Sequence, residues 1–218
     1  PAYREAVIDR SRRNVIRDKN QCCVIFWSLG NESGMGTNIE EAGRWVKQYD
    51  PTRLVHYESC HFQPEGHVKD ESMLDVESHM YASTQQIDEY FAAPGEKKPF
   101  IQCEFVHAMG NGPGDIEDYM QQIYKYDGFC GGFVWEWCDH ATYEGRAEDG
   151  REMYHYGGDA GEYPHDGNFC MDGLVFPDRR PHEGLYEWKN CIRPVRAELI
   201  DRTKGIMRLH NMLDFRNL

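Results

Sequence analysis

The sequence predicts an α/β fold built around a mainly parallel sheet, and two observations carry this prediction. Short apolar runs such as Val24-Ile25-Phe26-Trp27 have the composition of buried parallel strands. Segments with helical periodicity separate these runs, so that strand and helix alternate about five times through residue 192. After residue 192 two strand-like segments follow each other directly. Five parallel strands leave two architectures open, a doubly wound sheet or part of a barrel.

The individual elements follow from the apolar pattern and from the residues that end each segment. Apolar residues on one face of a charged segment predict a helix over residues 3–20. Further helices are expected at 39–49, which Asp50-Pro51 ends, and at 85–92, 114–126 and 183–191. Strands are expected at 24–29, 54–57, within 73–81, and at 100–103, 131–137 and 174–176. A Gly- and Asp-rich loop is expected from about 141 to 167, and two strands at 195–200 and 205–209.

Composition excludes several classes of partner. A net charge of −13 opposes binding to the phosphates of nucleic acids and to anionic membranes, so neither is expected as a partner. None of the eight cysteines lies in a CxxC pair, which favours reduced, structural thiols and a cytoplasmic location. The chain begins at Pro1 without an initiator methionine, so a processed product or an excised piece of a longer parent is expected. A periplasmic or secreted parent therefore stays open.

Two glutamates stand where a buried strand is predicted to end. Glu32 lies in Ser28-Leu29-Gly30-Asn31-Glu32-Ser33-Gly34, and Glu104 directly follows the apolar run 100–103. The carboxyl ends of parallel strands build active sites, and a carboxylate is costly to desolvate there without a chemical role. For one glutamate, a structural ion pair or a helix cap is the better interpretation. Two carboxylates that face one site are the machinery of glycoside hydrolysis.

Other segments of the sequence have the composition of possible binding sites. The segment 110–114 is rich in glycine but has neither the GxGxxG spacing nor a GK[ST] motif, so we interpret it as a turn. The ten histidines form no HExxH motif; His107 is assigned to substrate binding and His79 is left open. Trp135 and Trp137 are two residues apart in an expected strand, which places them on one face. Trp137 is assigned to the core and Trp135 to the site.

Four segments in one order resemble a known family. SLGNESG, CEFVHAMGN, GGFVWEW and FCMDGLVFPDR are similar to the catalytic barrel of glycoside hydrolase family 2, and within it to the β-galactosidases. The resemblance runs from about residue 15 to residue 188. It implies a partial (β/α)8 TIM barrel, about strands four to eight, over residues 1–192. Residues 193–218 are then expected to be the truncated start of a β-sandwich domain.

The same resemblance implies roles for individual residues. Glu32 matches the general acid/base and Glu104 the nucleophile of a retaining, double-displacement mechanism that cleaves terminal β-D-galactosides. The residues matched to substrate binding are Asn31, Tyr81, His107 and Trp135. Glu32 also matches a magnesium ligand, and the Phe169 carbonyl and Asp172 match sodium ligands. Asp172 stands where an asparagine is often found, which leaves the sodium site open, and no organic cofactor is implied.

The resemblance also bears on partners and on alternatives. It implies a β-galactoside such as lactose or a galacto-oligosaccharide as substrate, and a homo-oligomeric parent. An incomplete barrel leaves a sheet edge open, so an inert fragment or a self-associating module remains an alternative. A carbohydrate-binding module is a further alternative, because such a module needs the aromatic residues but not both glutamates. Another β-glycosidase specificity within the family is less favoured.

Overall fold

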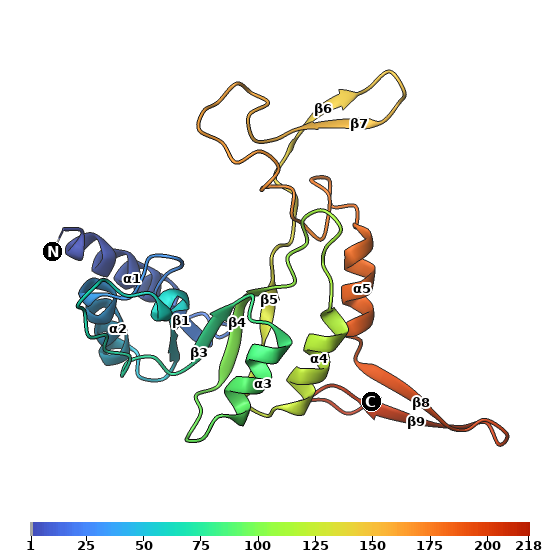
Figure 1. The fold of residues 1–218 in the computed structure, drawn as a ribbon, viewed down its shortest axis with the longest axis horizontal. Helices are drawn as coiled ribbons and strands as arrows, with labels where there is room; N and C mark the ends of the chain where they lie inside the picture. Colours follow the sequence, from blue (N-terminus) through green and yellow to red (C-terminus); the bar gives the residue numbers. More distant parts are fainter. Residues whose placement is uncertain (1) are drawn as a thin grey trace. The chain divides into compact units, whose positions relative to one another are not determined.

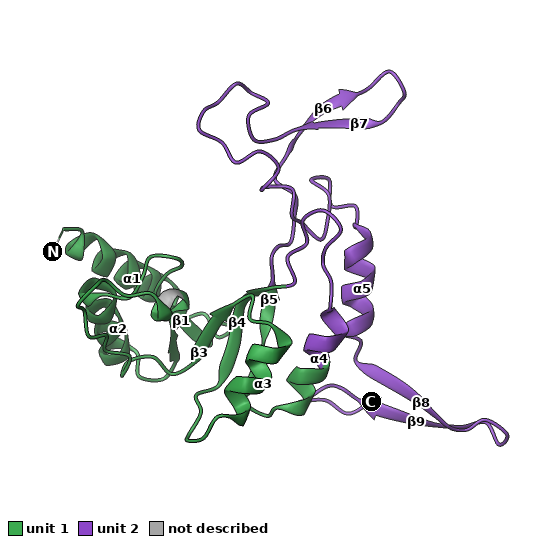
Figure 2. Ribbon diagram, viewed as in Figure 1, with its two compact units in different colours: residues 1–105, 121–133 green, residues 106–120, 134–218 purple. Residues whose placement is uncertain are grey.

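The chain is described from a computed structural model that covers residues 2–218. It divides into two compact units, which Figure 2 shows in different colours. Unit 1 comprises the described residues through Phe105 together with Gln121–Phe133, and unit 2 comprises Val106–Met120 and Val134–Leu218. Helix α4 (Ile116–Lys125) and strand β5 (Phe129–Val134) contribute residues to both units. Each unit is described by itself.

The first half of unit 1 is built from two helices and a pair of parallel strands. Helix α1 (Arg4–Asp18) packs against α2 (Thr37–Tyr49), and β1 (Phe26–Ser28) pairs in parallel with β2 (Leu54–His56) (Figure 1). A crossover helix between parallel strands is the usual βαβ arrangement. Buried side chains of these elements and of the segments beside them form one apolar core of Val15, Trp27, Leu29, Met35, Ile39, Val46, Val55, Tyr57, Cys60, Met73 and Leu74.

The second half of unit 1 is a sheet in the strand order β3-β4-β5. Strand β3 (Glu77–Met80) pairs in parallel with β4 (Phe100–Phe105), with a register shift between His79 and Met80. Helix α3 (Thr84–Ala92) connects these two strands, and a capping box of Ser83 and Gln86 begins it. Tyr90 and Phe91 on α3 pack on the ring of Phe100, which joins the helix to the sheet.

Unit 2 contains helix α5 (Glu183–Cys191) and two antiparallel strand pairs. Strands β6 (Thr142–Arg146) and β7 (Glu152–His155) form one pair, and β8 (Val195–Asp201) and β9 (Ile206–Asn211) form the other. The guanidinium of Arg196 on β8 forms an ion pair with Glu117 of α4, inside the same unit. This ion pair joins the last hairpin to the helix.

The structure confirms the mixed α/β character and all five predicted helices, with small shifts in their ends. Four expectations were wrong. The expected loop over 141–167 contains the β6–β7 hairpin, and residues 174–176 form only isolated bridges through Val175. Strand β5 ends at Val134, so Trp135 and Trp137 do not share a strand face. Trp137 is largely exposed, which contradicts its assignment to the core. The partial barrel and the β-sandwich character of residues 193–218 stay predictions, as does the domain boundary at residue 192.

A buried acidic residue links the end of α2 to β1. The Asp50 carboxylate accepts hydrogen bonds from the Thr52 hydroxyl, from Trp27 Nε1 at 2.9 Å and from Arg53 Nη1 at 2.6 Å. The Thr52 hydroxyl, with Trp27 and Arg53, holds the pKa of Asp50 well below its usual range. The ionised form of Asp50 therefore stabilises the core of unit 1.

We expect Asp50→Ala to lower the free energy of unfolding by about 3 kcal/mol, because buried donors lose their acceptor. Denaturant titration measures this loss, and Asp149→Ala, which removes an exposed ion pair with Arg151, is the control that should change little. The contribution of Asp50 is complete above its unfolded pKa of about 3.9 and declines as the pH falls below it. Asp50→Asn should therefore flatten the acid side of the stability profile; an unchanged slope would contradict this role.

Candidate functional site

Glu32 lies in a tight turn that follows strand β1. Its backbone has a φ of 50°, in the left-handed region that non-glycine residues seldom adopt. The Glu32 N–H donates a 2.8 Å hydrogen bond to Glu58 Oε2, and Glu58 is only 5% exposed. Glu58 begins the 3₁₀ helix η1 (Glu58–His61), which follows β2 after the single residue Tyr57. A buried carboxylate thus holds the backbone of Glu32 in a strained conformation, which is a feature of functional sites.

Glu104 and Tyr81 form a second pair in the same unit. Glu104 is the penultimate residue of β4, and Tyr81 directly follows β3 with a φ of 52°. The Tyr81 N–H donates to the Glu104 carbonyl at 2.9 Å, and the Tyr81 hydroxyl donates to Glu104 Oε2 at 3.0 Å. The parallel pairing of the two strands therefore continues into a direct contact between the two side chains.

A cavity of about 590 Å³ opens beside these residues in unit 1. Its volume is in the range of sites that bind small molecules. Its lining residues come from the segments that follow β1 and β2, from the end of β3 and from the residue after β3: Glu32, Gly34, Glu58, His61, Phe62, His79, Met80 and Tyr81. Glu32 and Tyr81 thus share one cavity, and Asn31 adjoins Glu32 in the same turn.

A separate group of candidate residues lies in unit 2. Trp135 Nε1 donates a 3.0 Å hydrogen bond to Asp172 Oδ2, and His107 Nε2 lies 3.9 Å from the same oxygen. The Ala108 N–H donates to the Trp135 carbonyl at 2.8 Å, so His107, the residue before Ala108, lies close to the backbone of Trp135. Three of the predicted residues, His107, Trp135 and Asp172, therefore lie close together: Trp135 is hydrogen-bonded to Asp172, and His107 is within ion-pair distance of it.

Asp172 is the most unusual charge of this group, being only 1% exposed. Burial and the nearby carboxylate of Glu136 raise its pKa above the ordinary value of an aspartate. Among the described residues, no group donates a hydrogen bond to its Oδ1 atom. A buried carboxylate oxygen beside a second carboxylate is a position that a cation would neutralise. Phe169 is 64% exposed, and its carbonyl as a ligand stays a prediction.

The structure adds one residue that the sequence analysis missed. Glu58 directly follows the predicted strand 54–57, so it satisfies the same pattern, a carboxylate at a strand end, that singled out Glu32 and Glu104. Glu58 was missed because, unlike Glu32 and Glu104, it has no glycine-rich segment nearby in the sequence. Of the predicted residues, the structure joins Tyr81 to Glu104 and gives Glu32 and Tyr81 a common cavity. The separation of the Glu32 and Glu104 carboxyl groups stays a prediction.

Comparisons with known proteins agree on one family. The family model described as glycosyl hydrolases family 2, TIM barrel domain, matches residues 1–197. The chain is 55% identical to the β-galactosidase of Actinobacillus pleuropneumoniae over 218 residues, 100% of this chain and 21% of that protein. It is 46% identical to the β-galactosidase of Staphylococcus xylosus over 98% of this chain and 21% of that protein. The chain thus spans about a fifth of the length of these relatives.

Solved structures share the fold at low identity. The β-glucuronidase of Ruminococcus gnavus superposes with a TM-score of 0.55 at 18% identity, covering 86% of this chain and 34% of that one. The β-glucuronidase 3 of Bacteroides uniformis gives a TM-score of 0.59 at 14% identity, covering 90% and 29%. In the described part of this chain, no helix has both the length and the apolar character needed to cross a membrane.

We expect Glu58→Ala to release the Glu32 turn without unfolding the chain. Loss of a hydrogen bond to a buried carboxylate should speed amide exchange at Glu32 by about 10- to 100-fold. Residue-resolved hydrogen exchange measures this rate, and Glu65→Ala, at an exposed position of the same segment, is the matched control. If the Glu32 amide exchanges at the same rate in Glu58→Ala and in the control, Glu58 does not hold the turn.

Proposed function

Because the chain belongs to the TIM-barrel domain of glycosyl hydrolase family 2, we propose that it carries the catalytic glutamates of a retaining β-galactosidase. The family match over residues 1–197 and the two β-galactosidase relatives support this proposal. The contact that carries it furthest is the hydrogen bond from Tyr81 to Glu104, beside a cavity that Tyr81 shares with Glu32. The activity is proposed for the protein of which this chain forms a part.

Glu104 is the proposed nucleophile. Its ionised carboxylate attacks the anomeric carbon of the galactoside, and the bond from that carbon to the leaving oxygen breaks. The product of this step is a covalent galactosyl ester on Glu104. The hydroxyl of Tyr81, 3.0 Å from Glu104 Oε2, orients the carboxylate for attack.

Glu32 is the proposed general acid and base. In its protonated form it donates its proton to the leaving oxygen as the ester forms. It then removes a proton from the incoming water, whose oxygen attacks the anomeric carbon and releases Glu104. A retaining mechanism of this kind requires the two carboxyl groups to lie roughly 5–5.5 Å apart. The strained backbone that Glu58 holds would position the Glu32 side chain for both proton transfers.

Galactose specificity and substrate binding are part of the same proposal. The hydroxyl-rich ring would be bound by the amide of Asn31 and the imidazole of His107, and Trp135 would offer its aromatic face. The 55% and 46% identity to β-galactosidases supports a β-galactoside, such as lactose or a galacto-oligosaccharide, as the substrate. The glucuronidase structures, at 14–18% identity, bear on the fold alone. A homo-oligomer is proposed for the longer protein.

The two proposed metal ions fit this chain unequally. Sodium fits the acceptor-rich environment of Asp172, whose buried Oδ1 lies without a donor among the described residues. Asp172 and the Phe169 carbonyl would hold it, and the ion would supply positive charge beside the sugar. For magnesium the chain offers Glu32 as a ligand. The described residues form one group of three close metal-ligating side chains, and Glu32 does not belong to it. No step of the mechanism is routed through either ion.

The alternative is that this chain alone is an inert or self-associating piece. Exposed apolar side chains on one hairpin favour this alternative: Leu199 is 55% exposed, Met207 57% and Leu209 61%. Such a surface promotes association. Sedimentation of the chain at several concentrations separates a monomer from a self-associating species.

Incubation with a 2-deoxy-2-fluoro-β-galactosyl inhibitor should add one covalent sugar to Glu104. Intact mass and peptide mapping detect the adduct on the chain and on the longer protein. An adduct on both would mean that the site assembles in this chain. An adduct on the longer protein alone would favour the inert-piece alternative, and an adduct on neither would overturn the galactosidase proposal.

Substitution separates the two glutamates by role. In the longer protein, Glu104→Gln should lower kcat by on the order of 10³-fold or more, and azide should not restore a product of retained configuration. Glu32→Ala should be rescued by azide, which replaces the water and needs no general base, to give a β-galactosyl azide. Near-normal turnover in Glu104→Gln would rule out the nucleophile assignment.

Sodium should stabilise the chain through Asp172. Replacing choline chloride by sodium chloride at equal ionic strength should raise the Tm of the wild-type chain, because a bound cation offsets a buried negative charge. Asp172→Leu, which removes both carboxylate oxygens, should reduce this response, and Asp149→Leu, the same change at an exposed side chain, should not. Equal responses of all three proteins in thermal denaturation would contradict a sodium site at Asp172.

A further inference from the structure

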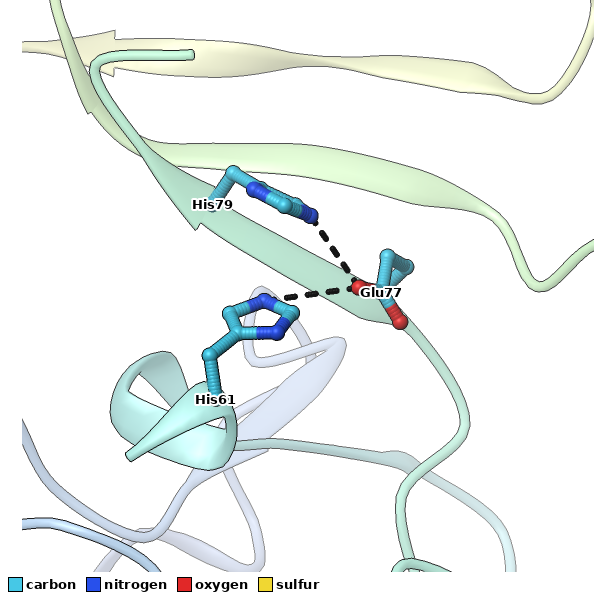
Figure 3. Close-up of side chains that lie close together, drawn as sticks. All are labelled: His61, Glu77 and His79. Atoms are coloured by element: carbon cyan, nitrogen blue, oxygen red, sulfur yellow. Dashed lines mark hydrogen bonds and ion pairs between the residues drawn. The ribbon is translucent and has the colours of Figure 1, made fainter. Parts of the chain in front are cut away.

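Three metal-ligating side chains converge in unit 1 outside the proposed catalytic pair. They are His61 on η1 and Glu77 and His79 on β3, and Figure 3 shows both imidazoles directed at the Glu77 carboxylate. Glu77 Oε1 lies 3.1 Å from His79 Nε2 and 3.4 Å from His61 Nε2. One ligand atom from each of the three residues lies within 4.8 Å of the others. We propose that this cluster binds a divalent transition metal of the zinc class.

The spacing of the three atoms fits such an ion. Zinc bonds to imidazole nitrogen and carboxylate oxygen are about 2.0–2.2 Å long, so two ligand atoms of a tetrahedral site lie roughly 3.3 Å apart. The two distances from Glu77 Oε1 agree with this edge length. Two imidazoles and one carboxylate select zinc-like ions rather than magnesium, which prefers oxygen ligands alone. The remaining coordination position would be open to water.

The ligands are held in place before any ion arrives. The His79 ring stacks on Phe100 at 5.0 Å with an interplanar angle of 18°, and the His61 ring packs on His79 at 4.3 Å. Glu77 and His79 are two residues apart on β3, so the strand directs both to one face. Because packing restricts these rings, little conformational freedom is lost when a metal binds.

Local protonation must change when the metal binds. Ligation through Nε2 places the ring proton of each histidine on Nδ1. His61 Nε2 lies 2.9 Å from the Ser78 carbonyl, and ligation replaces that hydrogen bond. Cys60 adjoins His61 in the sequence but is not among the described residues whose ligand atoms converge.

Metal at this cluster would act on the cavity described above. His61 and His79 line the cavity that Glu32 and Tyr81 also line. The ion would tie η1, which begins at Glu58, to β3, which Tyr81 directly follows. It would thereby rigidify the two segments that position these residues. The inference rests on the cluster alone and does not depend on the proposed glycosidase activity.

Calorimetric titration of the chain with zinc, in the presence of excess magnesium and a thiol-free reductant, tests the proposal. We expect one high-affinity zinc ion per chain in the wild type. His61→Gln, Glu77→Gln and His79→Gln should each weaken it by at least about tenfold, because even residues that only support a metal ligand commonly contribute that much. His155→Gln is the matched control, since His155 is half-exposed and faces a single carboxylate, Glu144, at 3.5 Å.

Cys22 and Cys23 are exposed thiols next to each other in the sequence, and such a pair can compete for zinc. A Cys22→Ser/Cys23→Ser variant should bind zinc as the wild type does. Cobalt in place of zinc should give the absorption of nitrogen and oxygen ligation without a thiolate charge-transfer band. Unchanged affinity in all three cluster variants, or loss of binding in the cysteine variant, would overturn the proposal. If Glu77→Gln fails to fold, His61→Gln carries the test, because the His61 side chain is 39% exposed.

Discussion

The parallel pairing of β3 with β4 is the constraint on which the features of unit 1 depend. The adjacent residues His79 and Met80 of β3 pair with Gln102 and Glu104 of β4, which are two residues apart, so β4 has one extra residue at this point, as in a β-bulge. Beyond that bulge, the Tyr81 hydroxyl meets the Glu104 carboxylate at 3.0 Å. Before it, Glu77 and His79 lie on one face toward His61. One irregular strand pairing thus serves both the proposed nucleophile and the proposed metal cluster.

Buried carboxylates recur in this chain, and each is stabilised in a different way. Asp50 is surrounded by donors, and its pKa is held low. Glu58 accepts the backbone N–H of a strained turn. Asp172 has one donor in Trp135 and one oxygen that no described group satisfies, and its pKa is raised. A carboxylate that the protein leaves without donors is the better candidate for an ion or a substrate, because satisfied carboxylates have no need of either.

Prediction from sequence succeeded where the signal is local. Helical periodicity and the Asp50-Pro51 stop identified the helix that ends at Tyr49, and the pattern after residue 182 identified Glu183–Cys191. It failed where pairing partners decide. The β6–β7 hairpin lies in a stretch whose glycines suggested only a loop, and cross-strand hydrogen bonds, which no local pattern reports, stabilise it. Trp135 lies one residue beyond the end of β5, so an argument from strand alternation did not apply.

The sequence by itself determined the family and the two glutamates proposed for the chemistry, because those residues lie in contiguous motifs that can be read without a structure. It also determined the helices, whose hydrogen bonds are local to the segment. Only the tertiary structure decided that Glu58 holds the Glu32 turn, that Trp135 and His107 meet at Asp172, and that His61 joins Glu77 and His79. These contacts join segments separated by 16 residues or more, and such contacts depend on strand register and packing, which a single segment does not encode.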